Sequence, residues 1–386
     1  MDDPYQDREQ TKAKHFLLKR YLQALAFKIL NFSDLTYIDG FSGPWKTKTE
    51  NFTDSSFMIA INALKDAQQK IFEKTGKRRR IGCFFSETNS TAFAKLQEAV
   101  SPYHRPQDLF EIKSYFGKFE NAVGEIQQFV ADSFALIFID PTGWKGYPFD
   151  KIKSLFAPRL CEVLINFMYS FVSRFVETED KEIIESLDPI LGGPGWQNRL
   201  DRSLPRREAV LMLFRQTLKA AGNFEFVVAT KIDKATEDRP HFFMAYGTKV
   251  YAGLKTFRDT EYKALRAHAV ARVGAKGRKQ EAKSHSPDFF MNHEASVQEA
   301  SIDEDIEMDM EKATKSLLQM LQKSGPQKFS HIAGRLMEIY MLRETNLKNV
   351  IVQLSRDGRI KNTWGGGTRK PRENDMIALE DVPSRS

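Results

Sequence analysis

The sequence has little cysteine and no long apolar run, and each absence narrows what the protein can be. Only Cys83 and Cys161 occur in 386 residues, and both lie within apolar, strand-like segments. We therefore expect reduced core thiols of a cytoplasmic protein, not a disulfide or a metal site. No stretch of about 18 residues is apolar and free of charge, so we expect no membrane span. The polar, initially acidic start, MDDPYQDREQ, is unlike a secretory signal.

Recognisable hydrolase, kinase and metal signatures are also absent. The seven histidines are scattered, and we find no Ser-His-Asp spacing, no phosphate-loop lysine and no metal-ligand cluster. What the sequence does have is enough apolar residues for a sizeable core, 41% of the total, and a formal net charge of +7. The positive balance favours a polyanionic partner such as DNA or RNA, although many enzymes without such a partner are equally basic.

The most informative stretch is residues 35–45, LTYIDGFSGPW, where an apolar strand-like run enters an acidic turn with two glycines. In α/β folds such a turn opens a nucleotide pocket at the carboxyl end of a buried strand. Gly40 and Gly43 lack a Cβ, so the chain can turn sharply there and a ligand can approach its backbone. By itself, DGxxG also describes an ordinary turn.

Strand-like and helix-like segments alternate after this stretch. The further apolar runs expected to be strands are residues 81–87, 111–116, 134–139 and 161–167. Because they are apolar on both faces, we predict a parallel sheet covered by helices, an α/β fold. Two later runs, 225–230 and 241–248, are separated by a polar turn instead of a helix. We predict that they form an antiparallel hairpin that closes one edge of the sheet.

This order of elements resembles the class I methyltransferases, a Rossmann-like fold that binds S-adenosylmethionine at the carboxyl ends of its first four strands. Several motifs are similar, in order and spacing, to the three-Cys-motif partner (TcmP) family: Lys14-His15, DGFSGP, FIDPTGW, LINF with Arg174 downstream, and GPGW at 193–196. The similarity covers residues 10–260. It implies a methyltransferase-like fold and a functional link to a separate three-cysteine protein.

The resemblance also implies cofactor contacts. The first loop would face the methionine end of S-adenosylmethionine, through Asp39, Gly40, Phe41, Ser42 and Gly43. Glu87, at the tip of the second strand, would accept hydrogen bonds from both ribose hydroxyls, and a charged acceptor strengthens such bonds. Alternatively, Glu87 lies in water or caps the helix that begins near Thr88. Residues 115–120 would approach the adenine, but no acidic or amide residue directly follows that strand.

The DPTGW sequence at 140–144 carries the expected chemistry. In methyltransferases of base amines, the acid of an Asp-Pro-Pro-aromatic loop accepts a proton of the amine and the ring stacks on a flipped base. Asp140, Pro141 and Trp144 supply comparable parts, but Thr142 replaces the second proline and Gly143 is inserted. Methylation of an adenine or cytosine amine is therefore one hypothesis. The alternative is that Asp140 only ends a strand and Trp144 packs in the core.

Four further residues are candidates for lining the substrate mouth of this site. They are Lys14, His15, Asn166 and Arg174. Asn166 has the most direct argument, because it ends the strand expected beside the one that leads to Asp140. Each of the four also has a plausible structural role.

The rest of the chain suggests a second domain. We divide the sequence into a methyltransferase-like domain (1–262), a charged linker (263–311) and a winged helix-turn-helix domain (312–386). Residues 263–311 run from a basic block to an acidic block with low hydrophobicity, which predicts a mobile segment. The winged helix is expected from three helix-like pieces, 312–321, 329–341 and 345–357, followed by strands at 359–364 and 376–379 around a turn at 365–367.

The third helix of this domain is where a winged helix reads DNA. The polar residues on it that we expect to contact nucleic acid are Asn346, Lys348, Asn349 and Arg356. Winged helices also bind proteins, so this choice stays open.

Two functions are consistent with these observations. The first is an S-adenosylmethionine-dependent methyltransferase of DNA or RNA, in which the enzyme mainly orients the nucleophile toward the methyl group. The second is a non-catalytic partner of a three-Cys-motif protein that binds nucleic acid or protein through the winged helix.

Overall fold

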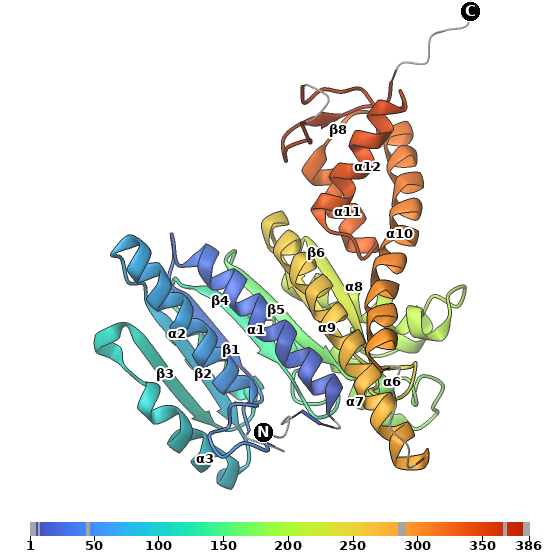
Figure 1. Cartoon of the computed structure of the whole chain (residues 1–386). Coiled ribbons are helices and arrows are strands. Elements are labelled where there is room, and N and C mark those ends of the chain that lie inside the picture. Colours follow the sequence, from blue (N-terminus) through green and yellow to red (C-terminus); the bar gives the residue numbers. More distant parts are fainter. Residues whose placement is uncertain (1–4, 7, 44–46, 285–290, 366–368, 381–386) are drawn as a thin grey trace, which may run out of the picture. The chain divides into compact units, whose positions relative to one another are not determined.

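The computed structural model describes residues 5–6, 8–43, 47–284, 291–365 and 369–380. The chain forms two compact units (Figure 1). Unit 1 contains Met1–Lys249 and Ala271–Asp288, and unit 2 contains Val250–Val270 and Phe289–Ser386. We describe each unit by itself. No helix among the described residues is long and apolar enough to cross a membrane.

Unit 1 is built around a seven-stranded sheet with the order β3-β2-β1-β4-β5-β7-β6. Its strands are β1 (Leu35–Asp39), β2 (Ile81–Glu87), β3 (Phe110–Phe116), β4 (Phe134–Ile139), β5 (Cys161–Phe167), β6 (Phe226–Asp233) and β7 (Pro240–Thr248). The first five strands are parallel, whereas β7 is antiparallel to both β5 and β6. The predicted α/β fold, with a mostly parallel sheet and an antiparallel hairpin at one edge, is confirmed.

The sheet is buried on both faces because helices cover it on each side (Figure 1). The helices of unit 1 are α1 (Glu9–Ile29), α2 (Ser56–Thr75), α3 (Ser90–Val100), α4 (Val123–Val130), α5 (Phe149–Phe156), α6 (Tyr169–Val172), α7 (Lys181–Leu191) and α8 (Arg206–Gly222). On one face, Ile137 and Ile165 of the sheet join a core with Ile152 of α5 and Phe214 of α8. On the other face, Phe57 of α2 packs edge-on against a phenylalanine of β2. Every side chain of β1, β2, β4 and β5 is buried, as expected for strands covered on both sides.

Unit 2 corrects the expectation of a mobile linker. Its helices include α10 (Met291–Ser324) and the first part of α9 (Tyr251–Ser284), so the described part of residues 263–311 is helical. Residues 285–290 of this range lie outside the described residues. The prediction rested on low hydrophobicity and on the separation of the basic block from the acidic block. In the structure they pair, because Arg266 of α9 makes ion pairs with Glu299 and Asp303 of α10.

The C-terminal part of unit 2 contains elements close to those predicted. After α10 come β8 (Gln327–Lys328), α11 (Phe329–Ile339), α12 (Glu344–Arg356) and β9 (Met376–Ile377). β8 pairs antiparallel with β9. The segment 359–364, predicted as a strand, is instead irregular apart from an isolated bridge between Ile360 and Leu379. Gly366 and Gly367 of the predicted turn lie outside the described residues. The assignment of these elements to a winged helix stays a prediction.

Candidate functional site

The loop after β1 is fixed by Asp39, the last residue of the strand. Its side chain is fully buried. One carboxylate oxygen accepts a hydrogen bond from the Phe41 amide at 3.0 Å, and the other accepts one from the Ser56 hydroxyl at 2.7 Å. Because Ser56 is the first residue of α2, Asp39 ties the loop to the start of that helix.

Backbone contacts hold the same loop against β2. The amide of Ser42 donates to the carbonyl of Ser86 at 2.9 Å, and the hydroxyl of Ser86 donates to the carbonyl of Gly40 at 2.8 Å. A Cβ on Gly40 would lie 2.9 Å from the ring of Phe119. Glycine is therefore required here by a close approach between the loop and the segment after β3.

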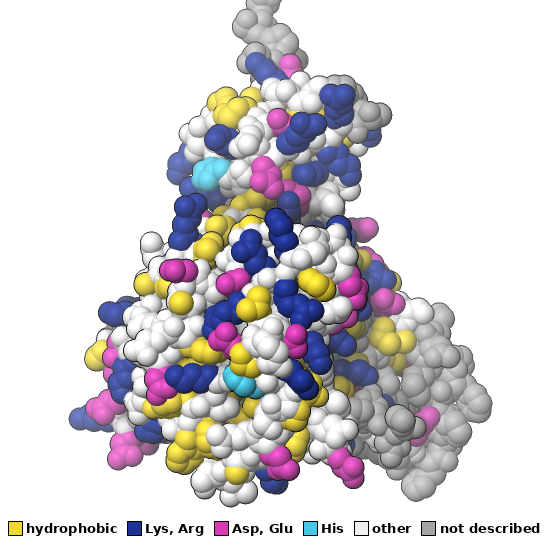
Figure 2. All heavy atoms as spheres, turned by 90° about the vertical axis from the view of Figure 1, so that its left-hand side faces the viewer, with side chains coloured by type: hydrophobic (Ala, Val, Ile, Leu, Met, Phe, Trp, Pro, Cys, Tyr) yellow, Lys and Arg dark blue, Asp and Glu magenta, His cyan; other side chains and the backbone are white. Residues whose placement is uncertain are grey.

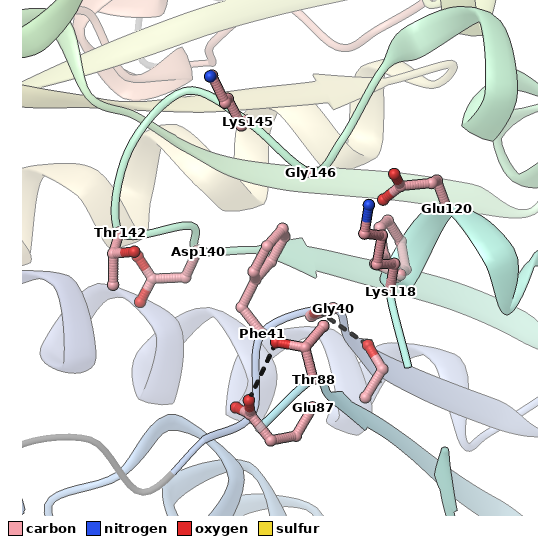
Figure 3. A pocket seen from close by; sticks show the side chains of 12 residues that line it. Gly40, Phe41, Glu87, Thr88, Lys118, Glu120, Asp140, Thr142, Lys145 and Gly146 are labelled. Carbon is pink, nitrogen blue, oxygen red and sulfur yellow. Dashed lines mark hydrogen bonds between the residues drawn. The ribbon is translucent and has the colours of Figure 1, made fainter. Parts of the chain in front are cut away.

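A cavity of about 570 Å³ opens at the carboxyl ends of the parallel strands, beside this loop (Figure 3). It is lined by Gly40, Phe41, Ser86, Glu87, Thr88, Lys118, Phe119, Glu120, Asp140, Thr142, Lys145 and Gly146. In Figure 3 the ring of Phe41 stands between Asp140 and Thr142 on one side and Lys118 and Glu120 on the other. The volume lies in the range of small-molecule and cofactor sites, about 300–1,000 Å³.

Glu87 ends β2 and lines this cavity, although only 5% of the residue is exposed. One carboxylate oxygen accepts a hydrogen bond from the Asn89 amide at 2.7 Å, and Asn89 is the N-cap of α3. The two alternatives considered for Glu87 are thus not exclusive. The side chain supports the start of the helix and also presents a carboxylate to the cavity.

Asp140 directly follows β4, and its carboxylate is held by two side chains, those of Lys14 and Asn166. Lys14 of α1 donates to one of its carboxylate oxygens at 2.5 Å, and the side-chain amide of Asn166 donates to the other at 2.6 Å. The side chains of Lys14 and Asp140 are only 12% and 15% exposed. The structure therefore brings together three residues that the sequence placed separately at the mouth of one site.

Lys14 and Asn166 contact Asp140 but do not themselves line the cavity, and the same holds for other predicted site residues. Trp144 donates its indole N–H to Ser186 at 2.9 Å and packs against Phe171 and Phe175, so the core alternative describes its position. Arg174 is exposed, and its guanidinium lies over the ring of Phe171. Pro141 is buried.

The first-loop residues Asp39, Ser42 and Gly43 are likewise outside the lining, and the contacts of Asp39 are internal to the fold. His15 is 7% exposed, hydrogen-bonds the Tyr5 hydroxyl at 3.1 Å and does not line the cavity either.

Burial shifts the pKa values of two ionisable side chains near the cavity, Asp39 and His15. It raises the pKa of Asp39 to about 6, against the opposing effect of the hydrogen bonds from Ser56 and Phe41. Burial lowers the pKa of His15 to about 3, and the neighbouring Lys14 ammonium acts in the same direction. His15 is therefore neutral at physiological pH, which excludes it as a cation that attracts phosphate.

The sequence did not single out several residues that line the cavity. Lys118 and Glu120 lie in the segment expected near an adenine, but neither had been assigned a contact. Thr142, Lys145 and Gly146 come from the loop after β4. The signal that the sequence offered was a second glycine in this loop, Gly146. In the structure it has a φ of +95°, and a Cβ there would lie 3.1 Å from the ring of Phe41.

In unit 2, the four residues expected to contact nucleic acid differ in exposure. The side-chain oxygen of Asn346 caps α12 by accepting from the Arg343 amide at 3.0 Å. Lys348 is half-buried and pairs with Glu344 at 3.2 Å. Asn349 and Arg356 are exposed. Asn349 also accepts a hydrogen bond from Lys370 at 2.7 Å, so three of the four side chains have structural contacts.

Charge on the surface is mixed. On the face shown in Figure 2, lysine and arginine side chains are interspersed with acidic and apolar ones and do not form one continuous patch. Among the described residues, no group of three or more His, Cys, Asp or Glu side chains is arranged to hold a metal ion.

Comparisons with known proteins add little. No protein-family model matches the chain, and no curated protein matches it. Among solved structures, a loganic acid methyltransferase with SAH is similar over 79% of this chain and 92% of its own, with 10% sequence identity and a TM-score of 0.28. A similarity of this degree carries no argument about function.

Proposed function

We propose that the protein is an S-adenosylmethionine-dependent methyltransferase with a nucleic-acid substrate. The observation that carries the proposal is the cavity at the carboxyl ends of the parallel strands, with Glu87 on one wall and Asp140 on another. Open α/β sheets bind ligands at this edge. The strand order, with an antiparallel β7 between β5 and β6, supports the proposal because class I methyltransferases share it.

The cavity residues fit the chemical groups of this cofactor. Glu87 offers a carboxylate to the ribose hydroxyls, and charge-assisted hydrogen bonds of this kind are strong. Phe41 and Phe119 offer aromatic surface for an adenine ring. Glu120 lines the cavity beside Phe119, so its carboxylate is our proposed acceptor for the adenine amino group. Glu120 thus supplies the acceptor that the sequence lacked directly after β3.

Asp140 is the proposed substrate-side group. When bound, the cofactor would supply a methyl group on a positively charged sulfur. The protein has to hold a nucleophile near that methyl group and accept the proton that the nucleophile loses, and orientation alone contributes a large part of such rate enhancements. A carboxylate held by Lys14 and Asn166 is a rigid acceptor for this purpose. Amines of nucleic-acid bases are our proposed nucleophiles.

We also propose that unit 2 is a winged helix and that the chain belongs to the three-Cys-motif partner family. One observation favours the second candidate function, a non-catalytic binding partner of a three-cysteine protein. Trp144, the aromatic residue of the altered 140–144 loop, packs against Phe171 and Phe175 and does not line the cavity. Thr345, Asn349, Gln353 and Arg356 are exposed polar residues of α12, and in this function they contact nucleic acid or protein.

Calorimetric titration with S-adenosylmethionine tests the first proposal. We expect wild-type protein to bind, and Glu87→Gln to bind about 10- to 100-fold more weakly. That loss corresponds to the 1.5–3 kcal/mol of a hydrogen bond to a charged group. Glutamine is chosen because its oxygen can still accept from the Asn89 amide. Glu125→Gln, at a half-exposed carboxylate of α4, is the matched control and should bind like wild type. Absence of binding by wild-type protein would reject the enzyme proposal.

Methyl transfer to mixed DNA and RNA separates the two candidate functions. The isolated chain should label nucleic acid from radioactive S-adenosylmethionine, and Asp140→Asn should abolish the labelling while cofactor binding is retained. Cofactor binding without any labelling, combined with capture of a three-cysteine protein, would support the non-catalytic role instead.

A further inference from the structure

The loop that follows β4 supplies hydrogen-bond donors to the cavity that the proposed function does not use. Thr142, Lys145 and Gly146 line the cavity from this loop, and both Thr142 and Lys145 are exposed. Within the described part of the chain, neither the Thr142 hydroxyl nor the Lys145 ammonium has a hydrogen-bond or ion-pair partner. Two donor side chains from one short loop are therefore open to a ligand in the cavity.

The backbone of the same loop is also without internal hydrogen bonds. From residue 142 to residue 147, no backbone amide donates to another group among the residues that the structure describes. Backbone amides are strong donors, so amides without a protein partner face water or a ligand. Gly146 has a φ of +95°. Successive amides with one residue at positive φ can form a concavity that binds an anion.

Charge decides which ligand this loop suits. Figure 3 shows Thr142 on the same side of the Phe41 ring as Asp140. The ion pair of Asp140 with Lys14 is neutral, so Lys145 adds one positive charge to the loop. Ammonium and amide groups only donate hydrogen bonds, and a hydroxyl can also donate. A cation would be repelled, whereas an anion with several acceptor oxygens satisfies all these donors.

We propose that Thr142, Lys145 and the backbone amides between them form a phosphate subsite, which holds the phosphodiester next to the target base. This inference rests on the proposed function and deepens it, because it assigns a contact that distinguishes a nucleic-acid strand from a free nucleoside. The hydroxyl and the ammonium donate to the two unbridged oxygens, and charge-assisted hydrogen bonds to phosphate are strong. Such a contact positions the strand beside Asp140 but reads no base sequence.

The test is calorimetry on the full chain saturated with S-adenosylhomocysteine, so that the probes cannot enter the cofactor site. The probes are two DNA tetranucleotides of one mixed sequence. One has phosphodiester linkages, and the other has methylphosphonate linkages, which keep the shape but remove the charge. In wild-type protein we expect the charged probe to bind about 10-fold or more tightly than the neutral one, as for a hydrogen bond to a charged group.

Three variants locate the contact. In Lys145→Gln the ratio of the two affinities should fall to about three or less. Thr142→Val keeps the shape of the side chain without its hydroxyl, and should lower the ratio by about 2- to 10-fold. Lys151→Gln removes the same charge from an exposed lysine of α5 and should keep the wild-type ratio. The affinity for S-adenosylhomocysteine should be unchanged in all three.

Inorganic phosphate separates a strand-binding subsite from a general anion site. We expect it to bind at least about 10-fold more weakly than the charged tetranucleotide, because it lacks the contacts of the flanking nucleosides. Equal affinity of the two would overturn the assignment to a nucleic-acid strand.

The other outcomes are also distinguishable. Equal affinity for the charged and neutral probes, or no binding of either at millimolar concentration, overturns the inference, while binding of S-adenosylhomocysteine leaves the proposed function standing. A preference for the charged probe that persists in Lys145→Gln shows that phosphate is bound elsewhere on the chain, and it overturns the inference too. Failure to bind S-adenosylhomocysteine removes the proposed function itself.

Discussion

Replacing Asp39 by asparagine should change how the stability of unit 1 depends on pH. Burial raises the pKa of this carboxyl to about 6 from its ordinary value of 3.8, so the folded state keeps a proton that the unfolded state has already lost. Between these two values the free energy of unfolding falls by about 1.4 kcal/mol per pH unit. The contribution of Asp39 is thus fully present below pH 3.8 and is lost as pH rises through 6. The total is about 3 kcal/mol.

Asparagine removes this titration and preserves most of the contacts. Its oxygen can accept from the Phe41 amide, and its nitrogen can donate to the Ser56 hydroxyl, which then turns its hydrogen elsewhere. The free energy of unfolding of Asp39→Asn minus that of wild type should therefore increase with pH. From the two pKa values we expect an increase of about 2 kcal/mol between pH 4.5 and 7.5.

Urea denaturation followed by tryptophan fluorescence measures this difference. Both proteins should carry Trp364→Phe, since the three remaining tryptophans belong to the range of unit 1. Other titrating groups are common to both proteins and cancel in the subtraction. Asp150→Asn, at an exposed carboxylate of α5, is the control and should show no comparable rise. A difference between Asp39→Asn and wild type that is constant over this pH range would refute the reasoning.

Two other substitutions test the packing that supports the site. Gly40→Ala should destabilise unit 1 by about 1–3 kcal/mol and weaken S-adenosylmethionine binding, since the new Cβ would lie 2.9 Å from the Phe119 ring. Thermal melts measure the first effect and calorimetry the second. An unchanged melting temperature would contradict the prediction. Glu162→Leu should cost about 2–4 kcal/mol in urea denaturation, because it leaves the buried hydroxyls of Tyr21 and Tyr246 without their carboxylate partner. Glu162→Gln keeps a hydrogen-bonding group and should cost less, so equal losses for the two variants would count against the hydrogen-bond explanation.

The sheet was predictable because its strands carry a strong local signal. The run 134–139 was expected as a strand and is β4, and the runs 81–87 and 161–167 are β2 and β5 with the same bounds. Each is a short apolar segment bounded by polar or charged residues, and burial on both faces leaves no polar alternation to confuse the pattern. The late hairpin was also visible, since its strands are separated by too few residues for a helical crossover.

The linker prediction was wrong for a physical reason. Blocks of like charge predict disorder only when each block is considered alone. Arg266 finds Glu299 and Asp303 on another helix, and Ile306 is 4% exposed, so the segment has both ion pairs and some apolar burial. Such pairing between helices depends on tertiary placement, which charge counts along the chain do not contain.

The site was only partly predictable. Strand order places Glu87 and Asp140 at one edge of the sheet, and the cavity there contains both. The ion pair between Lys14 and Asp140 joins residues 126 positions apart, so no local spacing could reveal it. The likeness of the 140–144 loop to an Asp-Pro-Pro-aromatic loop suggested the ring of Trp144 as a stacking surface. The position of a residue along the chain does not show where its ring points.

The position of Trp144 limits how a base could be held at Asp140. To stack on that base, Trp144 would have to break its hydrogen bond to Ser186 and leave its contacts with Phe171 and Phe175. Phe41 needs no such rearrangement, because its ring already lines the cavity that contains Asp140. One ring cannot cover both an adenine of the cofactor and a target base on the same face. A catalytic site therefore requires that Phe41 separate two compartments, with Glu120 on one side of its ring and Asp140 on the other (Figure 3).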